Sequence, residues 1–323
     1  MLPLSAGNVN NQWIALGGAS TPVDPNLKGE SSTEISAGGE YEIIPDGRLG
    51  LTYTHRFMNN VVEDGSQDNA NTYVLGNAGE GVLSSFPKWT RNYDAGSIYF
   101  NKSFSHRWQF EGSYTLSRLA GNYQGLFASQ GGIISQLDPN INASGDLKQW
   151  FVNSDGPLPG DHTHNFKVFA SYDLPVTTTS DLTMGLAYYG LSGSPTDYAG
   201  YDYISYNYYA QPNLFILPRG SGPRLPWTHE VDASFKFNKK VADASTLTAS
   251  VEIFNLFDFR EVTSVNQVYS NSVLAHPIVN GTPDQLATLK DANGNPAVKN
   301  PTFGQPNAYQ APLSVRLGLK LTF

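Results

Sequence analysis

Nine segments of the chain alternate apolar and polar residues with a period of two, and this alternation limits the possible folds more than any other feature of the sequence. The clearest segment ends the chain, where an apolar series from Leu313 to Phe323 alternates with a polar series that includes Arg316 and Lys320. Because successive side chains of a β-strand point to opposite faces, each segment is predicted to be a strand with one apolar face. The predicted strands are 35–43, 49–57, 98–104, 108–116, 166–174, 182–188, 227–237, 247–253 and 313–323.

The connections between these strands are alternately short and long. The short ones are rich in turn-forming residues and the long ones make up about half of the chain. Soluble domains seldom contain structureless connections beyond about 12–15 residues, whereas bacterial outer-membrane barrels have short periplasmic turns and long extracellular loops. The sequence therefore predicts an all-β fold, a transmembrane antiparallel up-and-down β-barrel. The short connections are 45–47, 105–107, 175–181 and 238–245, and the long ones are 59–91, 118–161, 192–224 and 259–311.

Composition excludes several classes of function. The net charge is -8 and no Lys/Arg-rich run occurs, so binding to nucleic acid is not expected. The chain has no cysteine, which excludes disulfides, thiolate metal sites and cysteine nucleophiles. It also has no apolar run of 18 residues, which excludes helical membrane spans, but a strand of about 9–11 residues is enough to cross a membrane in a barrel.

Two alternative folds are compatible with the same alternation. In a soluble β-sandwich the apolar faces of two sheets would meet in a core, and the protein would be a binding module. In a small closed outer-membrane barrel, serving as adhesin or pore, Asn8–Leu16 would supply a tenth strand, because single-chain bacterial barrels have even strand numbers. The alternation of short and long connections favours a membrane barrel over the sandwich.

Several short motifs resemble TonB-dependent outer-membrane receptors, most closely their Oar-like group. Near the C-terminus these are Ser250–Asp258 (SVEIFNLFD), Phe303-Gly304 and Pro312–Phe323 (PLSVRLGLKLTF). Further motifs are Asp24–Lys28, Glu34–Gly38, Lys102–Phe104 with Trp108, Ser113–Ser117 and Tyr189–Pro195. Their order and spacing extend the resemblance over residues 24–323.

The resemblance implies a 22-strand barrel of which these nine strands are the C-terminal part. Receptors of this kind also have a signal peptide, a TonB box and a plug, none of which is visible in this sequence, so we expect a truncated portion that is not competent alone. Residues 1–30 would be an extracellular loop segment at the truncated N-terminus, and residues 31–323 the barrel portion. The terminal Phe323 is similar to the aromatic residue that the barrel-assembly machinery recognises.

The function implied by the resemblance is that of an outer-membrane receptor and transporter. The parent protein would bind a ligand outside and import it with energy from TonB, which acts through the missing plug. The expected location is the outer membrane of a Gram-negative cell, and the expected partners are outer-membrane lipid, the assembly machinery, TonB and a ligand that the sequence does not identify.

Two groups of residues are candidates for ligand contact. Tyrosine offers a large amphipathic contact area at low entropy cost, and six tyrosines lie close together in the third long connection: Tyr198, Tyr201, Tyr203, Tyr206, Tyr208 and Tyr209. The second group consists of charged residues that would face the barrel lumen if the apolar faces meet lipid: Arg56, Glu111, Lys167, Asp232, Lys236, Glu252, Arg316 and Lys320. Wetting the lumen or packing against a plug is their simplest role.

No motif predicts an enzyme, a metal site or a cofactor. His162 and His164 would share one strand face, but no third ligand follows from the spacing. The segment Asp291–Asn295 resembles the start of a calcium loop, yet its glycine is misplaced, so we predict an ordinary Asn-Gly turn. Residues 190–194 miss the serine-hydrolase motif G-x-S-x-G at the last position, and Glu63-Asp64 would point to opposite faces of a strand.

Overall fold

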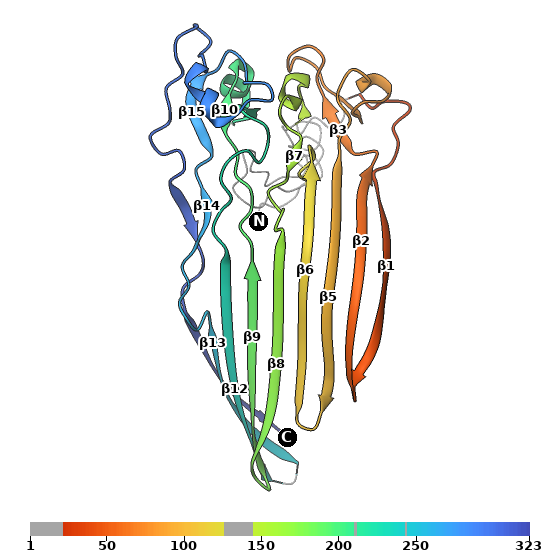
Figure 1. Ribbon diagram of the computed structural model, residues 1–323, viewed down its shortest axis with the longest axis vertical. Coiled ribbons are helices and arrows are strands. Elements are labelled where there is room, and N and C mark those ends of the chain that lie inside the picture. The colour runs from red at the N-terminus through yellow and green to blue at the C-terminus, as the bar shows by residue number, and fades with distance from the viewer. Residues whose placement is uncertain (1–21, 126–144, 210–211, 243) are drawn as a thin grey trace, which may run out of the picture.

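The computed structural model describes residues 22–125, 145–209, 212–242 and 244–323. Within them, nine long strands form one antiparallel sheet in which spatial order follows chain order (Figure 1). All nine strands predicted from the alternation are present. They are β1 (Ser31–Ile44), β2 (Gly47–Asn59), β5 (Arg91–Ser105), β6 (Trp108–Gly121), β8 (His164–Thr177), β9 (Ser180–Leu191), β12 (Thr228–Ala242), β13 (Ser245–Phe254) and β17 (Ser314–Thr322).

At the lower end of the sheet in Figure 1, tight turns join β1 to β2, β5 to β6 and β8 to β9. Between β5 and β6 the two turn residues, His106 and Arg107, have φ angles of 51° and 71°. Two-residue hairpins favour such left-handed turns because their twist matches that of the strands. The strands extend into the predicted short connections, so that only residues 45–46, 106–107 and 178–179 remain between them as two-residue turns, while β12 ends at Ala242 and β13 begins at Ser245.

The long connections gather at the opposite end of the sheet (Figure 1) and contain secondary structure that the alternation did not predict. They hold short strands and single helical turns, which are held together by contacts between different connections. These elements are β3 (Val62–Gly65), β4 (Val74–Asn77), η1 (Gly81–Leu83), η3 (Lys148–Phe151), β7 (Gly156–Pro157), β10 (Ala199–Tyr201), η4 (Ser205–Tyr209), β11 (Leu214–Phe215), β14 (Val262–Val265), β15 (Val268–Val273), η5 (Pro283–Thr288) and β16 (Pro306–Tyr309).

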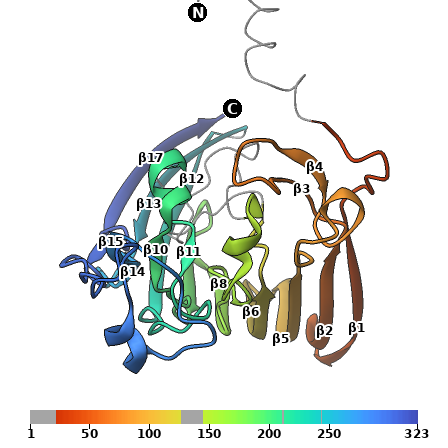
Figure 2. The same cartoon turned by 90° about the horizontal axis from the view of Figure 1, so that it is seen from above.

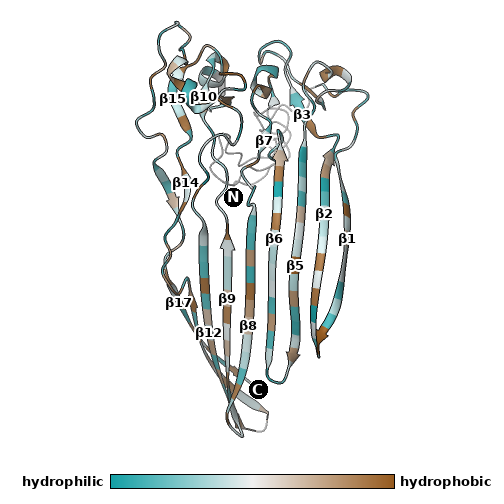
Figure 3. Ribbon diagram, viewed as in Figure 1, coloured by the Kyte–Doolittle hydropathy of each residue, from teal (hydrophilic) through white to brown (hydrophobic). Residues whose placement is uncertain are grey.

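The strand register sorts the side chains of the sheet into an apolar and a polar face. Val251, for example, stands opposite Phe235 on one side and Leu317 on the other, and all three belong to the apolar face. This face is uncovered, since Leu317 is 74% and Leu319 77% exposed. In Figure 3 hydrophobic and hydrophilic residues alternate along the strands. Exposed leucines in such number are typical of a surface that meets lipid.

All eight charged residues predicted for the lumen lie on the polar face. Lys236, for example, stands opposite Ser250, and Glu111 stands opposite Asn101. The sheet bends into an arc with β1 and β17 at its two ends (Figure 2). Two hollows of about 240 and 150 Å³ open on the polar face, one beside Glu111 and Lys167 and the other beside Asp232. The polar face is therefore the concave one.

Trp side chains lie at both borders of the apolar face, one near the long loops and the other near the tight turns. At the long-loop end His164 stacks on Trp227 and Trp227 on His229, with ring centroids 5.5 and 6.0 Å apart. At the turn end the ammonium of Lys102 lies 4.7 Å from the ring centroid of Trp108. Ten residues of a tilted strand span about 25 Å, the height of the apolar band of an outer-membrane barrel. Rings at both borders are the pattern expected at two membrane interfaces.

Among the described residues, β1 and β17 do not pair with each other, so the sheet is open. The β-sandwich alternative is wrong, because no second sheet covers the apolar face of the described strands. The tenth strand proposed for a small closed barrel, Asn8–Leu16, lies outside the described residues.

Candidate ligand-binding surface

The long connections pack into one cap through small hydrophobic clusters. Leu147 and Trp150 of the second connection are buried together, with Ala70 of the first and Ile204 of the third packed against them. A second cluster joins the third connection to the fourth: Leu214, Ile216, Leu217, Leu274 and Leu289. Each connection is thus held in place by its neighbours.

Asn153 is the polar link between three of these connections. Its side-chain amide donates to the carbonyl groups of Phe215, Ile216 and Ile278 at 3.2, 3.2 and 3.0 Å. Its Oδ1 accepts a hydrogen bond of 3.0 Å from the backbone N–H of Asn280. One side chain therefore fixes the second, third and fourth long connections relative to one another.

The predicted tyrosine segment lies in this cap, but its rings do not form one surface. Tyr198 packs between other rings, 5.9 Å from that of Tyr269 and 5.2 Å from that of Phe303. Tyr203 and Tyr206 are 64% and 51% exposed. The ring of Tyr201 is partly buried and meets Tyr206 edge-on at 5.6 Å. The side chains of Tyr208 and Tyr209 lie outside the described residues.

The exposed tyrosines are carried by a fixed piece of backbone. The carboxylate of Asp202 accepts hydrogen bonds from the indole N–H of Trp150 at 2.8 Å and from the backbone N–H of Ser205 at 2.7 Å. Trp150 is fully buried. The turn that presents Tyr203 and Tyr206 is therefore anchored to the second long connection, which lowers the entropy cost of binding through these rings.

Two buried, oppositely charged residues belong to the same long connection as the tyrosine segment. Asp197 and Arg219 are 5% and 3% exposed, and Oδ1 of Asp197 accepts a hydrogen bond from the backbone N–H of Gly220. Burial raises the pKa of Asp197 and lowers the pKa of Arg219 to about 10, while the attraction between the two opposes both shifts. The guanidinium carbon lies 4.3 Å from the ring centroid of Phe215. Both charged side chains therefore lie in the buried interior of the cap.

An ion pair between Asp161 and Arg224 ties the cap to the top of the sheet. Asp161 is 3% exposed, and its carboxylate accepts from the guanidinium of Arg224 and, at 2.6 Å, from the backbone N–H of Leu119. Arg224 also donates to the carbonyl of Gly193 at 3.0 Å. This network joins the strand ends of β6 and β9 to the segment that enters β12.

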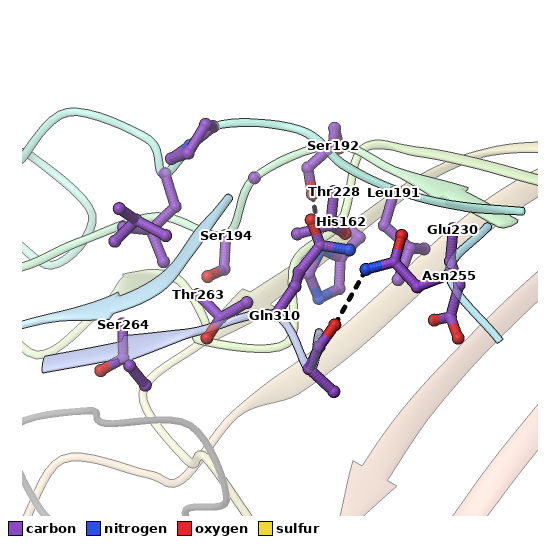
Figure 4. A pocket seen from close by; sticks show the side chains of 16 residues that line it. His162, Leu191, Ser192, Ser194, Thr228, Glu230, Asn255, Thr263, Ser264 and Gln310 are labelled. Carbon is purple, nitrogen blue, oxygen red and sulfur yellow. Dashed lines mark hydrogen bonds between the residues drawn. The ribbon is translucent and has the colours of Figure 1, made fainter. Parts of the chain in front are cut away.

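A cavity next to β9 and β12 was not predicted from the sequence. It has a volume of about 600 Å³ and lies where β9, β12 and the β14–β16 ribbon separate (Figure 4). Side chains of Glu230, Thr263, Ser264 and Gln310 line it. The sequence does contain one indication of this cavity. The predicted strand 227–237 is longer than its hairpin partner 247–253, so part of the longer strand is left without that partner.

The side chains of His162, His164 and Asp291 make hydrogen bonds within the protein. His162 contacts the carbonyl of Ser192 through Nδ1 at 2.6 Å, and Nδ1 of His164 contacts the hydroxyl of Tyr114 at 2.9 Å. The carboxylate of Asp291 accepts from the backbone N–H groups of its own turn, in which Gly294 has a φ of 85°. Within the described ranges no group of three potential metal-ligating side chains occurs.

Ion pairs connect some of the charged residues on the polar face. Arg316 of β17 pairs with Glu252 of β13, and Arg56 of β2 donates to Glu34 of β1 at 2.6 Å. The side chains of these partners are 30–68% exposed, and such surface pairs contribute about 0–1 kcal/mol each. In the described part of the chain, no helix is long and apolar enough to cross a membrane.

The sheet is antiparallel, its exposed face is apolar, aromatic residues lie at both borders of that face, and long loops gather at one end. These features define the class of outer-membrane β-barrel proteins. The sequence profile described as "Outer membrane beta barrel domain" matches residues 5–193, more than half of the chain. The chain belongs to this outer-membrane β-barrel family, and its location is the outer membrane.

One relative is the TonB-dependent transporter Oar of Myxococcus xanthus, to which this sequence is 39% identical over 338 aligned positions. The alignment covers 100% of this chain and 31% of Oar, so the chain spans about a third of the length of this relative. The resemblance to Oar-like TonB-dependent receptors is thereby confirmed. This relative is a transporter by name, not an enzyme.

Two solved receptors also match, at low identity. The ferric-catecholate import receptor Fiu from E. coli K12, in its closed form, is 14% identical with a TM-score of 0.40, covering 91% of this chain and 28% of Fiu. FpvA of P. aeruginosa, solved with a heterologous pyoverdine and iron, is 13% identical with a TM-score of 0.38, covering 73% of this chain and 24% of FpvA.

Proposed function

We propose that this chain is the C-terminal part of the barrel of a larger TonB-dependent receptor, which binds a ligand outside the cell and imports it with TonB-derived energy. The observation that carries this proposal is the 39% identity to Oar along the whole chain. The nine strands are then the last nine of a 22-strand barrel. Upstream strands would cover the open edges of β1 and β17, because unpaired backbone groups in lipid cost several kcal/mol each.

The two ends of the chain have distinct roles in this proposal. Residues 31–323 would be the barrel portion, and of the extracellular loop segment expected at residues 1–30, residues 1–21 lie outside the described residues. In support, the backbone N–H of Asp24 donates to the carbonyl of Leu75 at 2.9 Å, and Lys28 pairs with Glu80, both in the first long connection. At the other end Phe323, 92% exposed, would serve the barrel-assembly machinery as its recognition residue.

The proposed coupling to TonB is tested on the full-length protein. We expect the purified periplasmic domain of TonB to bind this protein in detergent, because the plug upstream of this chain would carry the TonB box. Removal of all residues upstream of this chain should abolish binding, as measured by surface plasmon resonance. If TonB binds neither protein while the full-length protein is folded, the proposed energy coupling is wrong.

The exposed tyrosines Tyr203 and Tyr206 are the part of the tyrosine segment that we propose for ligand contact. Replacing both with Ala in the full-length protein should weaken ligand binding to whole cells about tenfold or more, because contact aromatics typically contribute more than about 1 kcal/mol each. The matched control is Tyr198→Phe, which keeps the buried ring. Unchanged binding by the double variant, with normal mobility of the folded protein on gels, would reject this contact.

A further inference from the structure

The cavity of about 600 Å³ has walls from both the sheet and the cap. Leu191 ends β9, Thr228 and Glu230 lie at the start of β12, and residues 262–264 belong to β14. Among the described strands β14 pairs with β16 and not with β12, so the ribbon and the sheet stand apart here (Figure 4). Pockets that hold small molecules have volumes of this order. The space between the ribbon and the sheet is therefore large enough for a small ligand.

Glu230 places an unmatched negative charge at this cavity. It is the one carboxylate among the described lining residues, and neither Lys nor Arg is among them. No described residue forms an ion pair or a hydrogen bond with its carboxylate, and the charge of Asp232, two positions away on the same strand face, repels it. A positively charged ligand relieves this repulsion, whereas an anionic ligand finds no countercharge.

His162 gives the cavity a further hydrogen-bond acceptor. Its Nδ1 lies 2.6 Å from the carbonyl oxygen of Ser192, which can only accept, so Nδ1 carries the proton of the neutral ring. Nε2 is then the unprotonated nitrogen, and none of the described residues donates a hydrogen bond to it. A carboxylate and an imidazole nitrogen together favour a ligand that carries several N–H or O–H donors.

Ser194 contributes a buried hydroxyl group without a partner. The residue is 7% exposed, and its Oγ forms no hydrogen bond with any described residue. Figure 4 shows this hydroxyl directed toward the interior of the cavity. Buried polar groups in native proteins are nearly always hydrogen-bonded, so a polar group of a ligand is a natural partner for it. Hydroxyl groups of Thr228, Thr263 and Ser264 also line the cavity.

Other ligand classes fit this lining less well. No Phe, Tyr or Trp occurs among the described lining residues, so a flat aromatic ring finds no stacking partner. A bare metal ion is not favoured either, because the described ranges contain no group of three potential metal-ligating side chains. The remaining class is an aliphatic molecule with a positive charge and several hydrogen-bonding groups.

We propose that this cavity binds a small hydroxyl-bearing amine, with its ammonium group beside Glu230 and its hydroxyl groups on the serine and threonine side chains. An ammonium group donates up to three hydrogen bonds, and the carboxylate of Glu230 and Nε2 of His162 are the acceptors. The proposal deepens the proposed function, on which it rests, by assigning the ligand of the receptor to aminated polyols.

The experiment uses three probes that share one polyol chain and differ at one end. Glucamine carries an ammonium group, sorbitol a hydroxyl group and gluconate a carboxylate. Binding to the full-length receptor in detergent is measured by saturation-transfer NMR titration. We expect glucamine to bind about tenfold or more tightly than sorbitol, because hydrogen bonds to charged groups are stronger than neutral ones. Gluconate should not bind.

Glu230→Gln keeps the size of the side chain and removes its charge. The affinity for glucamine should fall about tenfold, to that for sorbitol. Ser194→Ala should weaken the binding of both probes by a similar factor, because it removes a hydroxyl group and no charge. The matched control is Glu40→Gln, which removes a carboxylate from the polar face of β1, outside this cavity, and should bind both probes as the wild type does.

The proposal is overturned if glucamine does not bind to the wild type, if sorbitol or gluconate binds as tightly, or if Glu230→Gln binds glucamine as the wild type does. The comparison of probes needs only the wild type, so it stands whatever the folding of the variants. Binding of the TonB periplasmic domain is measured on the same preparations. If TonB binds while any of these tests fails, the amine site is rejected and the receptor function stands. If TonB does not bind the wild type, the receptor function fails independently of the amine result.

Discussion

Val168→Arg in the full-length protein lowers the free energy of unfolding by about 2–4 kcal/mol, the cost of arginine facing lipid near the midplane of the bilayer. Val168 lies in the middle of β8 on the apolar face, opposite Gly112 and Tyr188. Neither of these two register neighbours carries a charge. The charged side chain must therefore reach an interface or thin the membrane.

The matched control is Ser171→Arg on the same strand. Ser171 pairs with Gln109 and Gly185 and belongs to the polar face, so an arginine there remains in the polar hollow of the sheet. We expect a change below about 1 kcal/mol. Unfolding by urea in lipid vesicles, followed by tryptophan fluorescence and gel mobility, gives both values. Equal destabilisation by the two substitutions would show that the faces have been assigned wrongly.

Asp161→Ala lowers the free energy of unfolding by about 2–3 kcal/mol, below the about 3–5 kcal/mol found when a fully buried ion pair is broken. The reduction reflects Arg224, which is 40% exposed and stays partly solvated. The substitution also leaves the backbone N–H of Leu119 without its acceptor. We expect faster protease cleavage of the cap in whole cells together with the loss of stability.

The control for this substitution is an exposed pair of similar geometry. On the polar face, Nη1 of Arg48 lies 2.9 Å from Oε1 of Glu40, and the two side chains are 60% and 44% exposed. Glu40→Ala should cost less than about 1 kcal/mol. If Asp161→Ala costs no more than Glu40→Ala, the contacts of Asp161 do not hold the cap.

The strands were predictable from the sequence because lipid on one side and water on the other impose a strict period of two. The pairing of Val251 with Leu317 and of Glu252 with Arg316 follows from that period once the hairpins are counted. The same period places every residue predicted for the lumen on the polar face. Closure of the barrel does not follow from it, because closure involves strands beyond this chain in the proposed receptor.

The cap was not predictable in the same way. Its contacts join residues far apart in the sequence, such as the indole of Trp150 with Asp202, and no local pattern marks such partners. Tyr198 was grouped with Tyr203 because both are tyrosines, yet one is packed among rings and the other is exposed. Burial of a loop residue depends on which other loops lie above it.

The three connections fixed by Asn153 cannot diverge independently during evolution. An insertion that displaces the carbonyl of Ile278 also removes a hydrogen bond that orients the segments around residues 153 and 216. If the cap contacts the ligand of the proposed receptor, a change of ligand specificity here requires compensating substitutions in two or three connections at once. Covariation between positions 153, 215, 216, 278 and 280 among homologues is the expected record of that constraint.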